Sequence, residues 1–341
     1  MKQLITTTRT KALALGRLLK TSNTEFKAFM ATYDALFTDS PENTKADYDQ
    51  GLPMRGYKPG SSPELEQYYK VIHLMCTLGS VEKMYMPPVM NLQKSVKENQ
   101  NLFEVELSKD LNVSKGDRVL DLGCGCGAMA EHIGAVTGAT VYGINIEPSQ
   151  IEKAWTNGNL PREHFKVADF NQPLEFNDGM FDAVYAVQPL TYASNLEFTF
   201  KEVFRVLKPG GKFVVNDVAA LDNYNRENNH HRLLIQHTRE LTAFGGFWHY
   251  RYWEDAFTNA GFLLLSSRGR SAVEMIRKER ALYDRFNVVF AALSKIRLVP
   301  RKVDTMLQRM NTNCASYIKA EEEELITLNW KYVTEKPAHQ P

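Results

Sequence analysis

The spacing of hydrophobic positions changes near residue 115 and divides the chain into two kinds of region. Residues 1–38 and 64–110 carry apolar positions at helical spacing. Between them, residues 39–63 are rich in Pro, Gly, Ser and Asp, which is typical of a loop or linker. After residue 115, short apolar runs alternate with amphipathic stretches. This alternation predicts a parallel sheet with helices between its strands.

Five strands are expected in this second region, at residues 117–123, 139–146, 164–170, 181–190 and 212–218. Helices are expected at residues 128–138, 148–158 and 196–211, with more helix around an aromatic run at residues 222–262 and a helix and strand in residues 316–337. We therefore expect an α/β fold: a Rossmann-like, doubly wound, mostly parallel sheet with N-terminal helices and a C-terminal cap of helix and strand. The expected division is an N-terminal helix and linker (1–63), a core with lead-in helices (64–220), and a substrate cap (221–341).

Composition narrows the class of protein. The chain has 341 residues, of which 43% are apolar, and this is enough for a sizeable core. Lys and Arg number 41 against 40 Asp and Glu, so no net field draws the chain to nucleic acid. The spacing of the four cysteines, Cys76, Cys124, Cys126 and Cys314, suggests neither a disulfide framework nor a metal site.

The N-terminal residues and the length of the apolar runs indicate where in the cell the protein is expected. Residues 1–20 are basic but lack a secretory signal pattern, and no apolar run reaches the length of a membrane span. A cytoplasmic location is expected, since free thiols fit a reducing compartment. Residues 1–20 are expected to form a solvated helix. The alternative is a transit-like helix or one that lies on a membrane such as that of the endoplasmic reticulum. The oligomeric state is not predicted.

A glycine-rich turn is the strongest local signal for a ligand site. Asp121 precedes Gly123, Gly125 and Gly127, after an expected strand and before an expected helix. Glycines there permit positive φ and a close backbone approach to a ligand. The pattern resembles the first motif of class I methyltransferases, which implies S-adenosylmethionine as cofactor. A plain strand-to-helix turn and the nucleotide turn of an NAD-dependent dehydrogenase are the alternatives. The turn at residues 207–211 (LKPGG) fits methyltransferases better.

Further cofactor contacts are expected where the next strands end. Asn145 stands where a Rossmann unit has its ribose-binding acid, and an amide also bonds hydroxyl groups. Asp169 resembles the family residue that holds the adenine amino group; the alternative is a turn cap. Gln188 is assigned to the rim where cofactor and acceptor meet. The candidate cofactor-binding residues are Asp121, Gly123, Gly125, Asn145, Ile146, Asp169 and Gln188.

A narrower resemblance rests on residues 120–151, 200–213, 223–235 and 298–337, which together are similar to the sterol methyltransferase family. The overlap runs from about residue 68 to residue 337 and implies a sterol substrate. Two features depart from the side-chain (C-24) branch. Residues 73–90 lack its Trp- and Gly-rich aromatic pattern, and Gln188 and Tyr192 replace a glutamate and a histidine.

These departures favour a different methylated atom. Methylation of an isolated side-chain double bond creates a carbocation, which needs a carboxylate or an aromatic face and then a base. A 3-keto sterol enolises toward C-4, and its enolate needs only a base and a donor for the oxygen. The pattern resembles the nematode branch that methylates the sterol A-ring at C-4. The alternatives are C-24 methylation, a phosphobase or fatty acyl acceptor, and a non-catalytic cofactor- or lipid-binding module.

The candidate catalytic residues are Tyr192, Asp217 and His230. Tyr192 follows the fourth strand, where ligands of α/β folds bind, and the alternative role is an interface aromatic. Asp217 ends the fifth strand, with helix capping as the alternative. His230 and His231 are adjacent, so at most one faces the site; solvated histidines are the alternative. The aromatic run at residues 244–253 is expected to line an apolar pocket or to form ordinary core.

Overall fold

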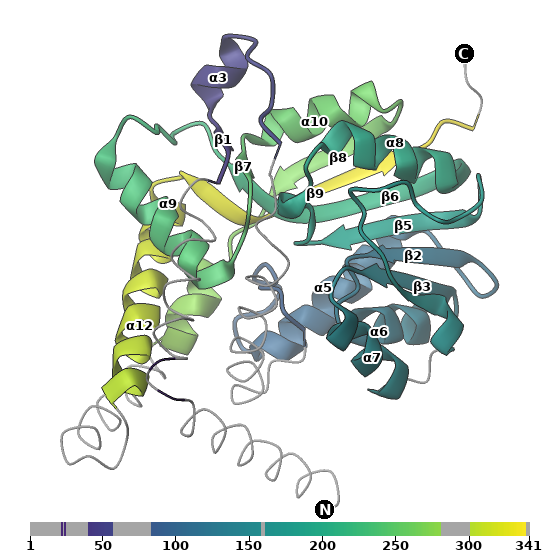
Figure 1. Cartoon of the computed structure of the whole chain (residues 1–341), viewed down its shortest axis with the longest axis horizontal. Coiled ribbons are helices and arrows are strands. Elements are labelled where there is room, and N and C mark those ends of the chain that lie inside the picture. The colour runs from purple at the N-terminus through teal and green to yellow at the C-terminus, as the bar shows by residue number, and fades with distance from the viewer. Residues whose placement is uncertain are drawn as a thin grey trace, which may run out of the picture.

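A computed structural model describes residues 40–56, 83–157, 161–280 and 301–338, together with Ser22 and Thr24 (Figure 1). Its main sheet has seven strands in the order β4-β3-β2-β5-β6-β9-β8. The first five are parallel, and β9 is antiparallel to both β6 and β8. The strands are β2 (Arg118–Leu122), β3 (Thr140–Asn145), β4 (Phe165–Val167), β5 (Phe181–Val187), β6 (Leu207–Ala220), β8 (Leu263–Gly269) and β9 (Ile326–Glu335). The α/β fold with a mostly parallel sheet is confirmed.

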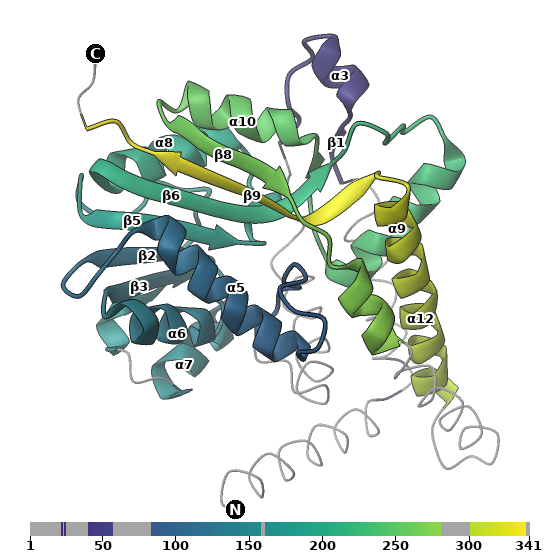
Figure 2. The same cartoon turned by 180° about the vertical axis from the view of Figure 1, so that it is seen from behind.

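Helices cover both faces of this sheet, as the doubly wound pattern predicts (Figure 2). One face packs against α5 (Val96–Leu111), α6 (Ala128–Thr137) and α7 (Pro148–Asn157); the other packs against α8 (Leu196–Val206) and α10 (Tyr250–Asn259). Because both faces are covered, a central strand such as β2 is buried along its length, with only Arg118 exposed at its start and with one buried acid, Asp121. Side-chain caps start several helices: Asn195, for example, accepts a hydrogen bond from the Phe198 amide at 3.1 Å at the start of α8.

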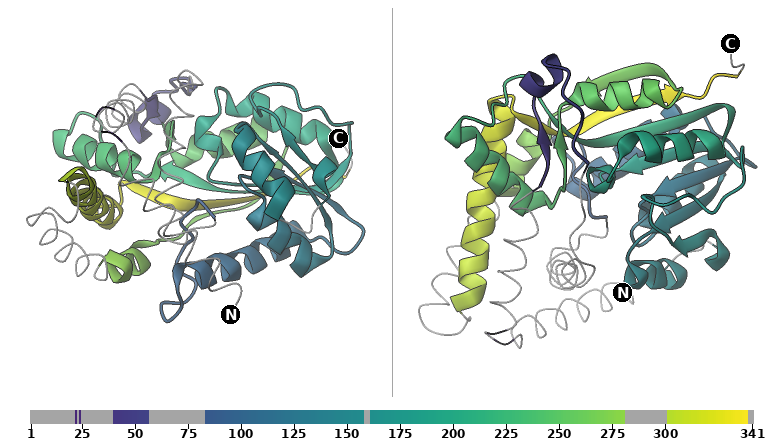
Figure 3. Two further views of the ribbon diagram at one scale, coloured as in Figure 1. Left: turned by 60° about the horizontal axis from the view of Figure 1, so that its bottom comes forward. Right: turned by 45° about the horizontal axis from the view of Figure 1, so that its top comes forward.

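The C-terminal strand differs from the expected arrangement in one respect. A strand was expected within a C-terminal cap, but β9 lies inside the main sheet, between β6 and β8. Its register on β6 runs from Lys212↔Glu335 to Ala220↔Ile326. The helical part of the expected cap is present: α9 (Asn229–Thr242) and α12 (Arg301–Glu322) pack side by side beyond the sheet (Figure 3). The sheet therefore draws strands from both sides of the expected boundary at residue 220.

The segment expected as a loop contains ordered elements in its described part, residues 40–56. It holds β1 (Glu42–Asn43) and the short helix α3 (Lys45–Asp49), and β1 pairs in parallel with β7 (Phe247–Trp248). The expected helix at residues 1–38 lies outside the described residues, apart from Ser22 and Thr24, and so do residues 64–82 of the expected helical range 64–110. In the rest of that range, helix begins only at Val96. Among the helices that the structure does describe, none has the length and apolar character to cross a bilayer.

Candidate functional site

The glycine-rich turn opens the site at the carboxyl end of β2. The amides of Gly123 and Cys124 both donate to the carbonyl of Ile144, at 3.0 and 2.9 Å, which fixes the turn against β3. Gly123 has φ +91°, and a Cβ there would lie 2.5 Å from Pro189 Cβ, so only glycine fits. Gly125, at φ +54°, lies against Gln150. Gly127 precedes α6, and no side chain caps that helix. Its first amides therefore remain for a ligand.

Asp121 is the acidic residue of this turn. The residue is 3% exposed, and its Oδ2 accepts a hydrogen bond from the Tyr185 hydroxyl at 2.7 Å. Burial raises the pKa of Asp121 to about 7; the hydrogen bond from Tyr185 opposes this shift, and the charge of Glu104 adds to it. The turn thus presents a buried carboxyl group beside open backbone amides, which is a suitable environment for an ammonium or another cationic ligand group.

The other cofactor candidates follow the neighbouring strand ends. Asn145 ends β3, and its Nδ2 lies 3.4 Å from Gln150 Oε1. Ile146 is 53% exposed, which leaves an apolar surface at that edge. Asp169 follows β4, where its Oδ1 accepts from the Asn171 amide at 2.9 Å and caps the turn. The parallel register places these residues on the same edge as the glycine-rich turn.

The loop after β5 brings together Gln188, Tyr192 and Asp217. Asp217 is fully buried; its two carboxyl oxygens accept from the amides of Leu190 and Val218, each at 2.8 Å. Burial raises the pKa of Asp217 to about 7, against the lowering effect of these backbone hydrogen bonds. η2 (Leu190–Tyr192) forms part of this loop, and the Tyr192 hydroxyl donates to the carbonyl of Ala243.

Gln188 is bonded in a different way. Its side chain contacts Met86, from the segment that precedes α5, and Leu328 of β9. Gln188 directly follows β5, and its expected place at the rim of cofactor and acceptor stays a prediction. The sequence did not predict its two partners, which lie more than a hundred residues away along the chain.

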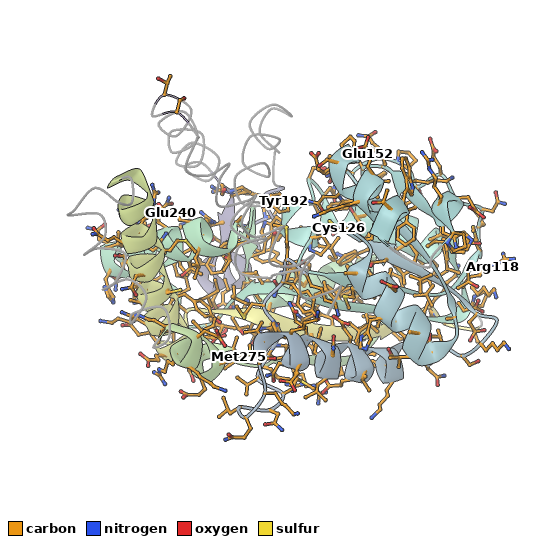
Figure 4. The ribbon with its side chains drawn as sticks, turned by 90° about the horizontal axis from the view of Figure 1, so that it is seen from below. Arg118, Cys126, Glu152, Tyr192, Glu240 and Met275 are labelled. Carbon is orange, nitrogen blue, oxygen red and sulfur yellow. The ribbon has the colours of Figure 1, made fainter. Side chains whose placement is uncertain are left out.

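His230 does not join this group. It lies near the start of α9, half exposed, with its Nε2 3.1 Å from Glu323 Oε1. Ala243, the partner of Tyr192, follows the other end of the same helix. Their separation of 13 positions corresponds to about 20 Å along a helix. His231 shares the Glu323 contact at 4.0 Å. Figure 4 draws Tyr192 and Cys126 near the middle of the molecule, with Glu240 of α9 toward one end.

A buried polar cluster behind Asp121 was missed by the sequence reading. Glu104 of α5 is fully buried and accepts from Lys83 Nζ at 2.5 and 2.7 Å and from the Tyr85 hydroxyl at 2.6 Å. Its other carboxyl oxygen lies 2.5 Å from Nδ1 of His132 on α6. A signal for this cluster was available, because Glu104 falls on the same helical face as the apolar positions 103, 107 and 111.

The aromatic run at residues 244–253 contributes mainly to the core. Phe247, Trp248 and Trp253 are fully buried. Trp248 and Trp253 pack on the face that α8 and α10 cover, whereas Phe247 packs with α9 and α12. This matches ordinary core packing. Within the described residues, no cluster of His, Cys, Asp and Glu is arranged to hold a metal ion.

Comparison with known proteins agrees with this geometry. Residues 120–215 match a family model described as a methyltransferase domain. A stretch of 163 residues is 37% identical to the sterol 24-C-methyltransferase of Aspergillus fumigatus and covers 47% of this chain and 43% of that protein. Residues 120–215 are thus similar to a methyltransferase domain, and a larger part of the chain is similar to a sterol methyltransferase. The match includes the glycine-rich turn, β5 and most of β6.

A second curated protein and a solved structure are also similar to this chain. The sterol 4-C-methyltransferase of Caenorhabditis elegans is 33% identical over 156 residues, which are 45% of this chain and 46% of that protein. The chain thus spans less than half the length of these curated relatives. Among solved structures, the cyclase SpnF aligns with a TM-score of 0.62 at 18% identity and covers 84% of this chain and 100% of that one. At that identity the likeness shows the fold alone.

Proposed function

We propose that this chain is an S-adenosylmethionine-dependent methyltransferase that acts on a sterol. The observation that carries the proposal is the turn from Asp121 to Gly127, at the carboxyl edge of a methyltransferase domain. The chemistry that this cofactor supplies when bound is an electrophilic methyl group on a sulfonium.

The residues at the edge fit such a cofactor. The buried carboxyl of Asp121 suits its ammonium group, and the amide of Asn145 suits ribose hydroxyls. The exposed Ile146 offers an apolar surface for the adenine face, and Asp169 follows β4 where an adenine amino group would be held. Gly123 lets the turn pack directly against Pro189, because a Cβ there would collide with that side chain. The chain's own contribution is to bind, to orient and to exclude water.

We further infer that the acceptor is a 3-keto sterol, methylated at C-4 of the A-ring through its enolate. Gln188, in the loop after β5, replaces an acid, and Asp217, in the neighbouring strand β6, is buried with both oxygens accepting backbone hydrogen bonds. Neither position therefore presents an exposed carboxylate to a cation. Tyr192 is the proposed donor to the acceptor oxygen, after exchange of its bond to Ala243. Asp217, whose pKa is raised to about 7 by burial, is the proposed base that takes the C-4 proton when the enolate forms. His230 keeps its catalytic assignment only as a prediction.

A second candidate is methylation of the sterol side chain at C-24, because the similarity to the sterol 24-C-methyltransferase is at least as strong as that to the 4-C enzyme. We also propose a cytoplasmic protein that contacts the endoplasmic reticulum membrane, where sterols dissolve. In this proposal, residues 1–63 form an N-terminal segment, residues 64–220 hold the cofactor and residues 221–341 contribute the substrate cap.

Cofactor uptake tests the broader proposal. Calorimetry should detect binding of S-adenosylmethionine to the full chain. Asp121→Ala should weaken this binding by about tenfold or more, because a hydrogen bond to a charged group is worth roughly 1.5–3 kcal/mol. Asp255→Ala, at an exposed position of α10, is the matched control and should bind normally. Absence of uptake by the natural sequence would reject the proposal, and normal affinity in Asp121→Ala would reject the role of Asp121.

Product analysis tests the choice of acceptor. The chain should be incubated with the cofactor and either a 3-keto sterol or a C-24-unsaturated sterol, and the products compared by mass spectrometry. We expect a 4-methyl product from the keto sterol. Methylation of the side chain alone would support the second candidate. Cofactor binding without methylation of any sterol, phosphobase or fatty acyl acceptor would indicate a binding module.

A further inference from the structure

Residues 83–91 form an irregular segment whose backbone is bonded largely by side-chain amides. Asn99 of α5 accepts from the amides of Met90 and Asn91, each at 2.8 Å. Gln100 of α5 donates to the carbonyls of Lys83 and Tyr85, at 3.1 and 2.8 Å. These bonds dock one side of the segment on α5 and satisfy backbone groups that no helix or strand satisfies.

The opposite side of this segment is held by Gln188. Its Oε1 accepts from the Met86 amide at 3.2 Å, and its Nε2 donates to the Met86 carbonyl at 3.1 Å. The same Nε2 donates to the carbonyl of Leu328 in β9 at 2.9 Å. The backbone amide of Gln188 is also engaged, with the Asn216 carbonyl at 2.8 Å. One side chain thus joins the segment to the ends of β5 and β9.

The chemistry of these partners requires an amide at position 188. Met86 offers one donor and one acceptor, and Leu328 offers a second acceptor. A carboxylate only accepts, so it would face two carbonyl oxygens that it repels. Gln188 also adopts φ +59°, which is unfavourable for a residue with a Cβ. The backbone keeps this conformation while the side chain makes three hydrogen bonds, which is consistent with a position selected for its amide.

The segment also reaches the glycine-rich turn. The Tyr85 hydroxyl donates to Glu104, and the Glu104 and Asp121 carboxylates add to burial in raising the pKa of Tyr85. Tyr85 is therefore close to the acid of the turn, and its neighbour Met86 is bonded to Gln188 at the end of β5. Any displacement of the segment would move one boundary of the site.

We propose that Gln188 is a positioning residue that fixes residues 83–91 as a wall of the methyl-transfer site, and that this role requires an amide. The inference rests on the proposed function for the identity of the site, but the clamp itself is measured without catalysis. Gln188 contacts the wall through its amide and is not a catalytic residue. The position beside the acceptor consequently carries no charge.

Hydrogen exchange of the full chain tests this inference with three variants. Gln188→Met removes all three bonds without adding charge and should lower the protection factor of the Met86 amide by about tenfold or more, at both about pH 9 and about pH 5.5. Gln188→Glu should cause a similar loss near pH 9. It should recover part of the protection near pH 5.5, because a protonated carboxyl both donates and accepts. Gln93→Glu makes the same charge change at an exposed position and should change nothing.

Three outcomes would overturn the inference. The first is natural protection of Met86 in Gln188→Met, and the second is no recovery of Gln188→Glu at low pH. The third is a loss of protection that spreads equally over β2 and β5, which would mean general unfolding rather than release of a wall. Calorimetry with S-adenosylmethionine on the natural sequence separates the two proposals. Failure to bind would reject the function and leave the exchange result standing.

Discussion

Asp121 and Asp217 are two carboxyl groups that fold into the interior of the sheet. Burial raises the pKa of each to about 7, whereas an aspartate in an unfolded chain titrates near pH 4. Between about pH 4 and pH 7, the unfolded chain loses these protons and the folded chain keeps them. Their contribution to the free energy of unfolding is therefore fully present below pH 4 and is lost as the pH rises through about 7.

Substitution of Asp217 isolates its share of this pH dependence. In urea unfolding, the natural sequence should lose stability from about pH 5 to about pH 7, and Asp217→Asn should show a flatter profile because an amide does not titrate. Each group accounts for a change of the order of a few kcal/mol. The variant should also be less stable at both pH values, since its Nδ2 would face a backbone amide, either that of Leu190 or that of Val218. Asp255→Asn should keep the natural profile; an equally steep profile in Asp217→Asn would contradict the assignment.

Sequence patterns predicted single residues well where the reason was local. The glycines of the turn were predictable because positive φ and close packing need glycine whatever surrounds them. Asp217 and Tyr192 were expected near the site because the sequence predicted one at the end of the fifth strand and the other just after the fourth. Their bonds to Leu190 and Ala243 were not predictable, because such partners depend on how distant segments dock. His230 illustrates the opposite case. A histidine suggested acid/base catalysis, but α9 places this one beside Glu323 and away from the loop after β5.

Elements dock on one another through buried charge as well as through apolar packing. Glu104 joins α5, α6 and the segment 83–91, since its partners are His132 of α6, and Lys83 and Tyr85 of the segment. Both Glu104 and the Lys83 side chain are buried, at 0% and 7% exposure. Removing one member of such a pair leaves an uncompensated buried charge.

Glu104→Gln should consequently destabilise the fold by roughly 3–5 kcal/mol. The measurement is the free energy of unfolding in urea at neutral pH, with S-adenosylmethionine absent so that ligand binding does not contribute. Glu152→Gln, at an exposed position of α7, is the control and should change the same quantity by less than about 0.5 kcal/mol. If the two variants are equally stable, the buried contacts of Glu104 do not stabilise the docking of α5, α6 and residues 83–91.

Helices and strands in the core were largely predictable from hydrophobic periodicity. The runs that gave β2, β3, β5 and α8 are continuous or periodic enough to be read directly. The short strands β1 and β7 were not predicted, because a strand of two residues shows no hydrophobic periodicity. Their pairing depends on how the segment of residues 40–56 docks on the rest of the chain. Hydrogen bonds from the second half of the chain hold this segment; for example, Trp248 Nε1 donates to the Arg55 carbonyl at 2.7 Å.

At the scale of the whole molecule, the sheet joins the expected core (64–220) to the expected cap (221–341), which the sequence analysis separated. Strand alternation in the sequence identified the five parallel strands, but the antiparallel strands β8 and β9 follow long helical segments and gave no sign of joining them. β9 pairs with both β6 and β8 and so occupies an interior place in the sheet. Tyr332 of β9 is fully buried and packs against Trp253 and Phe257 on the face of α10.

Deletion of residues 323–341 should therefore unfold the core and not merely remove a cap. It takes away β9, which leaves β6 without its antiparallel neighbour and disconnects β8 from the sheet. The lost apolar contacts and ladder hydrogen bonds should exceed the roughly 5–15 kcal/mol by which a domain is stable. Calorimetry should then show no cooperative unfolding transition, whereas deletion of residues 339–341, outside the described part, should leave the transition unchanged. A cooperative transition in the shorter chain would mean that the five parallel strands fold on their own and that the boundary at residue 220 separates two independent units.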